Sequence, residues 1–253
     1  MNTKKFRSDL FIHLDGIALT PALSCIFNSS YKELEKLKSL EPFIINIQEL
    51  TNHKINSDYL NVTLRLFESQ GWIKREWLND EQIKICTTDY GYSFFENSNL
   101  YADYFQFYKH LSTVSFSTDE NYKILNQLLE QYQLIPSLKI NNKNILKHIE
   151  GVIIGPMLVS LFLNNYLSID KNGKMLFNNK ITAKNKNFIT NLFEKFSFIS
   201  DTLTLNEKGL FFCKRSSAYG VTVSYMPLFS KINKLLYGNT SNILDRDLNG
   251  TEL

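Results

Sequence analysis

The stretch His13-Leu-Asp-Gly-Ile-Ala-Leu-Thr-Pro-Ala-Leu23 decides the fold, because it recurs as His148-Ile-Glu-Gly-Val-Ile-Ile-Gly-Pro-Met-Leu158. The His, Gly, Pro and Leu are identical in the two stretches, and an acidic residue precedes the first Gly in both. A recurring pattern of this kind indicates that a structural unit has been duplicated within the chain.

Two further matches follow in the same order along the chain. Leu66–Ile73 matches Leu192–Ile199, and Ile85–Phe94 matches Leu203–Phe212. The offsets between the copies are 135, 126 and 118 residues, so the second copy is the shorter one between its anchors. Because the three matches keep their order, we predict an internal duplication that covers most of the chain.

Each copy is predicted to have the element order of a winged helix. In copy one, apolar residues from Leu14 to Cys25 recur at helical spacing, and Pro21 is expected to kink that helix. The remaining elements of copy one are a short helix with Ile45, Ile47 and Leu50, a helix capped by Ser57 and Asp58 that ends at Gly71, a hairpin from Trp72 to Ile85 with its turn at Asn79 and Asp80, and a helix capped by Thr88.

Copy two repeats this plan with one addition, a strand pair of its own. Its expected elements are a first helix over Ile149–Leu163, strands at Tyr166–Ile169 and Lys174–Phe177, a helix over Asn187–Phe196, a hairpin from Phe198 to Leu205 with its turn at Ser200 and Asp201, and a helix capped by Asn206. Hairpins and capped helices in this order predict a mainly α protein with short β-hairpins, built from tandem duplicated winged-helix-like units.

The duplication suggests a linear division of the chain. We expect a first winged-helix-like unit over residues 1–100, connecting helices over 101–140, a second unit over 141–214, and a junction with a C-terminal helix and a linker over 215–253. The connecting helices are predicted at Tyr101–His110 and Tyr122–Leu134, and the C-terminal helix at Met226–Tyr237. Residues from Asn239 onward are polar and are typical of a linker.

The composition narrows the class of protein. Hydrophobic residues make up 43% of the 253 residues, which is enough for a sizeable core, and the formal charge is only +3. Cys25, Cys86 and Cys213 lie far apart without a CxxC pair, which argues against a zinc site or a disulfide framework and predicts free thiols. The N-terminus shows no signal peptide and the apolar runs are short, so we expect a cytoplasmic protein that does not cross a membrane.

Two His and acid pairs are the candidates for chemistry. His13 with Asp15, and His148 with Glu150, recur in both copies, but side chains at positions i and i+2 of a helix point apart. We therefore interpret these residues as packing or capping positions and predict no catalytic residue and no metal site. The sequence also contains no GxGxxG, P-loop, GxSxG or HExxH motif, so no cofactor-binding residues are predicted.

The charge pattern disfavours binding of nucleic acid. The expected recognition helix of copy one, Asp58–Gln70, carries one Arg, one Asp and one Glu, and in copy two only Lys184 and Lys186 flank the corresponding helix. Winged helices that read DNA need several basic residues on that helix face. A DNA-binding transcriptional regulator remains an alternative, and a protein-interaction scaffold is a second one.

Residues 203–239 resemble a known family. The most specific pieces are Ala218-Tyr-Gly-Val-Thr-Val-Ser-Tyr225 and Leu235-Leu-Tyr-Gly238, which look like the region just ahead of the catalytic domain in bacterial class I S-adenosylmethionine-dependent methyltransferases. Some members of that group belong to polyketide and related natural-product pathways. The resemblance implies a non-catalytic N-terminal region that acts in dimerisation, as a substrate lid, or in docking to a carrier protein.

In that family a Rossmann-like domain that holds S-adenosylmethionine follows this region. The present sequence stops at Leu253, about where that domain would begin, so the resemblance implies a partner domain for the cofactor and no cofactor ligand in this chain. The implied partners are a C-terminal or separate catalytic methyltransferase domain, a second copy in a homodimer, and a carrier protein. An excised region and a stand-alone relative both fit the sequence.

The segment from Tyr219 to Tyr225 supplies the candidate site. Tyr219 and Gly220 are expected to break the preceding helix, after which apolar and hydroxyl residues alternate as in a short extended segment. Tyr219, Thr222, Ser224 and Tyr225 are therefore candidates to face a substrate or another domain. The alternative is that the segment is only a packing junction.

Overall fold

The structure is a computed structural model that describes residues 3–27, 31–135, 140, 142–201 and 203–238. Its contacts divide the chain into two compact units: unit 1 contains residues 1–18 and 107–226, and unit 2 contains residues 19–106 and 227–253. Helix α1 (Thr3–Ile26) therefore contributes its first part to one unit and its last part to the other. These units differ from the expected linear division, because the first part of α1 packs against copy two of the repeat.

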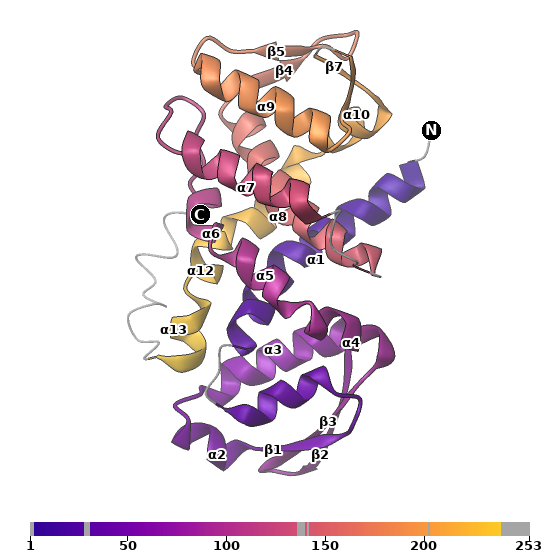
Figure 1. Ribbon diagram of the computed structural model, residues 1–253, viewed down its shortest axis with the longest axis vertical. Coiled ribbons are helices and arrows are strands. Elements are labelled where there is room, and N and C mark those ends of the chain that lie inside the picture. The colour runs from indigo at the N-terminus through magenta and orange to yellow at the C-terminus, as the bar shows by residue number, and fades with distance from the viewer. Residues whose placement is uncertain (1–2, 28–30, 136–139, 141, 202, 239–253) are drawn as a thin grey trace. The chain divides into compact units, whose positions relative to one another are not determined.

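Unit 1 is built around the long, largely buried helix α8. Figure 1 shows α9 lying beside the short strands of this unit. Its further elements are α6 (Tyr108–Leu111), α7 (Tyr122–Leu134), α8 (Lys143–Leu163), β4 (Leu167–Ile169), β5 (Met175–Phe177), α9 (Ala183–Lys195), β6 (Ile199–Asp201), β7 (Thr204–Leu205), α10 (Glu207–Cys213), η3 (Ser216–Tyr219) and α11 (Gly220–Ser224). The strands form two antiparallel pairs, β4–β5 and β6–β7, which an isolated bridge between Lys174 and Thr204 connects.

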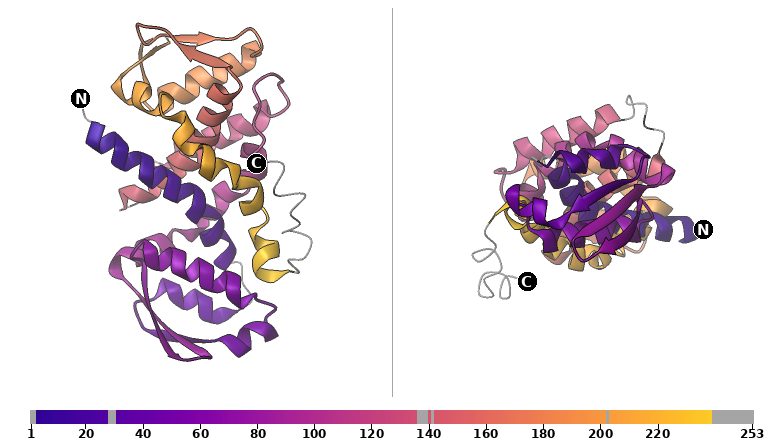
Figure 2. Two further views of the ribbon diagram at one scale, coloured as in Figure 1. Left: turned by 180° about the vertical axis from the view of Figure 1, so that it is seen from behind. Right: turned by 90° about the horizontal axis from the view of Figure 1, so that it is seen from below.

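Unit 2 contains a three-stranded sheet, which Figure 2 shows from below. Its elements are η1 (Lys32–Lys38), β1 (Phe43–Asn46), α2 (Ile47–Asn52), α3 (Ser57–Ser69), β2 (Ile73–Asn79), β3 (Gln82–Thr87), α4 (Asp89–Glu96), α5 (Ser98–Phe105) and α13 (Ile232–Tyr237), and α12 (Met226–Phe229) begins at the unit boundary. The strand order is β1-β3-β2 and all pairs are antiparallel. The described residues are thus mainly helical with short antiparallel β-pairs, which confirms the predicted fold class.

The two copies have matching helices at a constant offset. Helix α3 begins at Ser57 and ends at Ser69, and α9 begins and ends 126 residues later, at Ala183 and Lys195. After each helix the backbone takes a left-handed residue, Gly71 with φ 70° and Ser197 with φ 53°. The predicted left-handed cap at Gly71 is therefore confirmed, and its counterpart shows the same local geometry.

The wing of each copy is joined to the next helix by the same contacts. Gly91 in α4 and Gly209 in α10 each lie against a carbonyl group, that of Trp72 and that of Phe198, so closely that a Cβ atom would come within 3.0 Å of it. Both glycines donate their backbone N–H to a capping side chain over 3.0 Å, Gly91 to Thr88 and Gly209 to Asn206. The caps predicted at Thr88 and Asn206 are confirmed, and glycine is required at both helices by this close approach.

Several local predictions need correction. Ile45 lies in strand β1, where it is buried and pairs with Ile83, and not in a helix. Asn56 caps α3, because its side chain accepts the backbone N–H groups of Asp58 and Tyr59, so Ser57 and Asp58 are the first helical residues instead of caps. The cap was predicted one or two residues too late, because the capping residue is the one just before the first helical residue, which here is Asn56.

Other predicted boundaries also shift. The segment predicted at Tyr101–His110 divides into α5 and α6, and the one at Met226–Tyr237 divides into α12 and α13. Helix α1 continues through Pro21 to Ile26. Asp201 belongs to strand β6 and Leu203 takes φ 73°, so the second wing turns later than predicted. The predicted linker, residues 239–253, lies outside the described residues.

The first helices of the two copies cross inside unit 1. A Cβ atom on Gly16 of α1 would lie within 3.0 Å of the backbone of His148, and one on Gly151 of α8 would lie equally close to the backbone of His13. These four residues are the repeated His and Gly, 135 positions apart, so each copy places its Gly against the other's His. This reciprocal contact is the strongest structural support for the duplication.

Two of the described helices, α1 and α8, are long and apolar enough to cross a membrane. In the most apolar 18-residue stretch of each helix, 72% is buried within the structure. Helices that form the core of a folded protein have the same length and composition, so these features do not distinguish the two cases.

Candidate functional site

A buried polar cluster lies beside the helix crossing of unit 1. His13 Nδ1 is 2.7 Å from the hydroxyl of Tyr219, and His13 Nε2 is 3.4 Å from Oε2 of Glu150, which is long for a hydrogen bond. Lys147 Nζ lies 2.7 Å from the same Glu150 oxygen, and Tyr132 donates to the other oxygen over 3.1 Å. The acid that meets His13 therefore belongs to the other copy of the repeat.

The pKa shifts define the charges in this cluster. Burial lowers the pKa of His13 below its ordinary value, although Glu150 opposes the shift, so the imidazole is neutral. Burial acts to raise the pKa of Glu150, but His13 and Lys147 outweigh it and lower the pKa to about 2. Because the carboxylate only accepts, the neutral ring places its proton on Nε2 and accepts the Tyr219 hydroxyl at Nδ1.

The two rings of this cluster are closed to any substrate. His13 and Tyr219 are fully buried, and burial raises the pKa of Tyr219 well above its ordinary value, so its hydroxyl keeps its proton. A general acid or base must reach the proton that it transfers. We therefore interpret the cluster as a structural network that holds α1, α8 and η3 together.

The structure separates the four predicted site residues. Their segment is helical, with Tyr219 ending η3 and the others in or next to α11, so the expected extended segment is wrong. Tyr219 points into the core, and the Ser224 hydroxyl donates to the Val221 carbonyl within its own turn. Tyr225 is exposed, and Thr222 and Ser224 are partly exposed, so these three lie at the surface while Tyr219 does not. A helix pairs backbone N–H groups within the segment, as the N–H of Tyr225 donates to the carbonyl of Thr222, whereas a strand would need a neighbouring strand.

An exposed apolar surface that was not predicted from the sequence lies beside α11. Leu163 at the end of α8 is 76% exposed and Val221 on α11 is 72% exposed. A small pocket of about 360 Å³ opens here and is lined by Val159, Phe162, Leu163, Ser216, Ser217 and Gly220. We call Leu163, Val221 and this pocket the α8–α11 surface. A sequence signal existed, because the apolar face of Ile149–Leu163 continues to the last residue of the helix.

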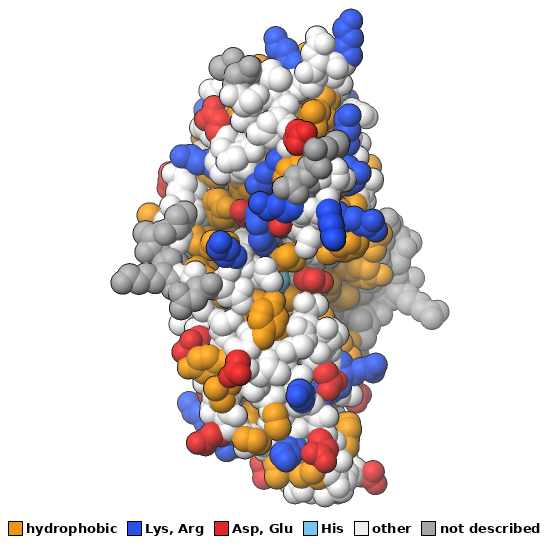
Figure 3. All heavy atoms as spheres, turned by 90° about the vertical axis from the view of Figure 1, so that its right-hand side faces the viewer, with side chains coloured by type: hydrophobic (Ala, Val, Ile, Leu, Met, Phe, Trp, Pro, Cys, Tyr) orange, Lys and Arg blue, Asp and Glu red, His pale blue; other side chains and the backbone are white. Residues whose placement is uncertain are grey.

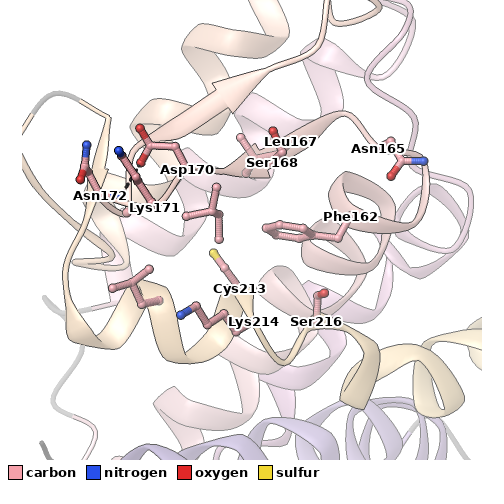
Figure 4. A pocket seen from close by; sticks show the side chains of 13 residues that line it. Phe162, Asn165, Leu167, Ser168, Asp170, Lys171, Asn172, Cys213, Lys214 and Ser216 are labelled. Atoms are coloured by element: carbon pink, nitrogen blue, oxygen red, sulfur yellow. Dashed lines mark hydrogen bonds between the residues drawn. The ribbon is translucent and has the colours of Figure 1, made fainter.

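A larger pocket of about 780 Å³ lies between the β4–β5 turn and α10, and we call it the α10 pocket (Figure 4). Its apolar lining comes from Phe162, Leu167, Ile169, Leu210 and Cys213. The Phe162 ring and the Cys213 sulfur point toward its middle in Figure 4. Burial raises the pKa of Cys213, so the sulfur there is a thiol that packs as an apolar group.

The polar part of the α10 pocket is positively charged. Lys171 in the β4–β5 turn and Lys214 at the end of α10 line it, and neither has an ion-pair partner among the described residues. Asp170 also lines it, but Asp170 Oδ1 accepts the backbone N–H groups of Asn172 and Lys174, each over 2.8 Å. The pocket thus combines an apolar lining with two ammonium groups that are unpaired within the described part of the chain.

The two units carry opposite net charge. By sequence, unit 1 has 17 Lys and Arg and 10 Asp and Glu, a difference of +7, while unit 2 has the remaining 11 and 15, a difference of −4. Figure 3 shows one face of the molecule, and Lys and Arg side chains gather in its upper part, over elements of unit 1. The small total charge of +3 therefore conceals a basic unit, which favours acidic or anionic partners.

The helix of unit 1 that corresponds to a recognition helix makes contacts within its own unit. Thr182, which caps α9, donates to Asp119 over 2.6 Å, and Lys184 lies 3.4 Å from the same carboxylate. Asn185 donates to the carbonyl groups of Phe116 and Thr118. In DNA-binding winged helices the start of this helix contacts base edges. Here that end of α9 is occupied by a neighbouring loop.

Among the described residues, no group of three or more His, Cys, Asp or Glu is placed to hold a metal ion. Cys25, Cys86 and Cys213 are free thiols, and Cys86 is the one that is partly exposed. The positions predicted to pack, His13 and His148, are buried as expected.

Comparison with known families gives two matches, and a search of curated proteins gives none. Residues 6–75 match the AprA N-terminal domain, and residues 150–239 match the AprA winged helix domain. The first match covers α1 through the start of the first wing, and the second covers most of copy two together with α11 and α13. Two segments of the chain are therefore similar to an AprA-type N-terminal domain and, after it, to an AprA-type winged-helix domain.

Proposed function

We propose that this chain is a non-catalytic region of an S-adenosylmethionine-dependent methyltransferase and that it docks the catalytic methyltransferase domain. The observation that carries the proposal is the α8–α11 surface, where Leu163 and Val221 are largely exposed beside an apolar pocket. Contiguous apolar groups on a surface mark contact sites for other proteins. Two residues of this surface, Gly220 and Val221, belong to the segment with the most specific methyltransferase resemblance, Ala218 to Tyr225.

Two further observations support a docking role over catalysis. The two rings of the polar cluster at the α1–α8 crossing, His13 and Tyr219, are fully buried and cannot reach a substrate. The AprA-type domains agree with the resemblance to regions that precede a methyltransferase domain, in proteins of which some serve polyketide pathways. S-adenosylmethionine would then bind to the catalytic domain and not to this chain.

A direct test is binding to the methyltransferase domain encoded in the same gene or beside it, measured by sedimentation velocity. Val221→Glu places a charge in the proposed interface and is expected to weaken binding at least ten-fold. Val62→Glu is the matched control, because Val62 is similarly exposed, at 61%, on α3 of unit 2. The absence of a complex, or equal binding by the two variants, would refute the proposal.

Two measurements separate the alternatives. Calorimetry of the chain with S-adenosylmethionine is expected to show no binding, and a measurable affinity would contradict a non-catalytic role. A gel-shift assay at low salt tests the DNA-binding regulator, which we disfavour because the first turn of α9 contacts the loop around Asp119. A retarded complex that survives physiological salt would favour the regulator instead.

A further inference from the structure

We propose that the α10 pocket is a binding site for a small molecule with an apolar chain and an anionic end group. The inference goes beyond the docking role, because the pocket is lined mainly by the β4–β5 turn and α10. It shares Phe162 and Ser216 with the pocket of the α8–α11 surface, but Lys171 and Lys214 line only the α10 pocket of the two. Its volume, about 780 Å³, falls within the range of roughly 300 to 1,000 Å³ typical of small-molecule sites.

The apolar lining determines the body of the ligand. Leu167 and Cys213 are almost fully buried, while Phe162, Ile169 and Leu210 remain partly accessible at the surface of the pocket. None of these side chains carries an ionised group, since the Cys213 thiol keeps its proton. Such a lining favours an aliphatic or aromatic segment, whose transfer from water is favourable in proportion to the buried area.

The two lysines determine the charge of the end group. Lys171 and Lys214 reach the pocket from its two flanking elements, and neither is neutralised by an ion pair among the described residues. The acid in the lining is Asp170, and its Oδ1 accepts two backbone N–H groups. An incoming carboxylate or phosphate would therefore meet two ammonium groups that form no ion pair among the described residues.

The turn that carries Lys171 is held in one conformation. Gly173 takes φ 82°, which L side chains rarely adopt, and its N–H donates to the carbonyl of Asp170 over 3.1 Å. The Gly173 carbonyl in turn accepts the N–H of Leu205 over 2.9 Å, which attaches the turn to strand β7. A fixed backbone under the lysine lowers the entropy lost on binding.

The test uses the full chain and four probes of equal chain length: octanoate, octyl phosphate, 1-octanol and octylammonium. Calorimetry is expected to show saturable binding of one or both anions and at least ten-fold weaker binding of the alcohol and the cation. The preferred anion would assign the end group as carboxylate or phosphate. Equal binding of octanol and the anions, or no saturable binding of either anion, would overturn the proposal.

Variants locate the site. The double variant Lys171→Met and Lys214→Met keeps the length of both side chains, removes the two charges, and is expected to weaken anion binding at least ten-fold. The control is the double variant Lys123→Met and Lys195→Met, which removes two exposed charges of unit 1 outside the pocket lining. Equal losses in the two double variants would indicate attraction to the overall charge of unit 1 and would refute a site. Because Val221 is absent from this design, failure here leaves the docking proposal standing.

Discussion

Replacing Gly151 by alanine tests the helix crossing on which unit 1 depends. A Cβ atom at this position would lie within 3.0 Å of the carbonyl oxygen and the Cα atom of His13, both of which belong to the backbone. Overpacking costs about 1–3 kcal/mol where side chains adjust, and a backbone contact places the cost near the upper end, at about 3 kcal/mol. Alanine stabilises a helix by about 1 kcal/mol relative to glycine, so the net loss is about 2 kcal/mol.

The assay is thermal unfolding followed by circular dichroism, with hydrogen exchange of α8 to assign the transition to unit 1. A loss of about 2 kcal/mol lowers the midpoint by roughly 4–8 °C in a chain of this size. Gly220→Ala is the matched control, because Gly220 lies in helix α11 and a Cβ atom there would contact nothing within 4 Å. It is expected to leave the midpoint unchanged or raise it slightly. If Gly151→Ala behaves like Gly220→Ala, the close crossing does not exist in solution.

Two further perturbations follow from the same structure. Burial lowers the pKa of His148 from 6.5 to about 3, so below pH 6.5 the unfolded chain takes up a proton that the folded chain does not. The free energy of unfolding is therefore highest above pH 6.5 and falls by about 2 kcal/mol at about pH 5. Urea unfolding at the two pH values measures this loss, and a His148→Asn variant without a smaller pH dependence would contradict the assignment. Substitution of either cap, Thr88→Ala in unit 2 or Asn206→Ala in unit 1, is expected to lower the free energy of unfolding by about 1 kcal/mol, because each side chain accepts the N–H of the glycine three residues later. Urea unfolding of both variants measures the two losses. A loss in only one of the two variants would argue against equivalent wings.

The elements that local chemistry specifies were predictable from the sequence. The caps at Thr88 and Asn206, the left-handed cap at Gly71 and the hairpin after Trp72 depend on residues within a few positions of one another. Helix α7 has the predicted bounds, Tyr122–Leu134. Errors occurred where neighbours in space compete with local preference, as at Ile45, which pairs with Ile83 in a sheet and leaves the predicted helix to begin at Ile47.

The sequence by itself determined that the chain contains a duplicated helix-and-hairpin unit, because the anchors recur in order and their geometry is local. It did not determine which acid meets His13, since the partner Glu150 lies 137 positions away on another helix. Only the tertiary structure placed Tyr219 in the core, left Val221 exposed, and formed the α10 pocket from α8, the β4–β5 turn and α10. These outcomes depend on how distant segments pack, and no local pattern of residues encodes that packing.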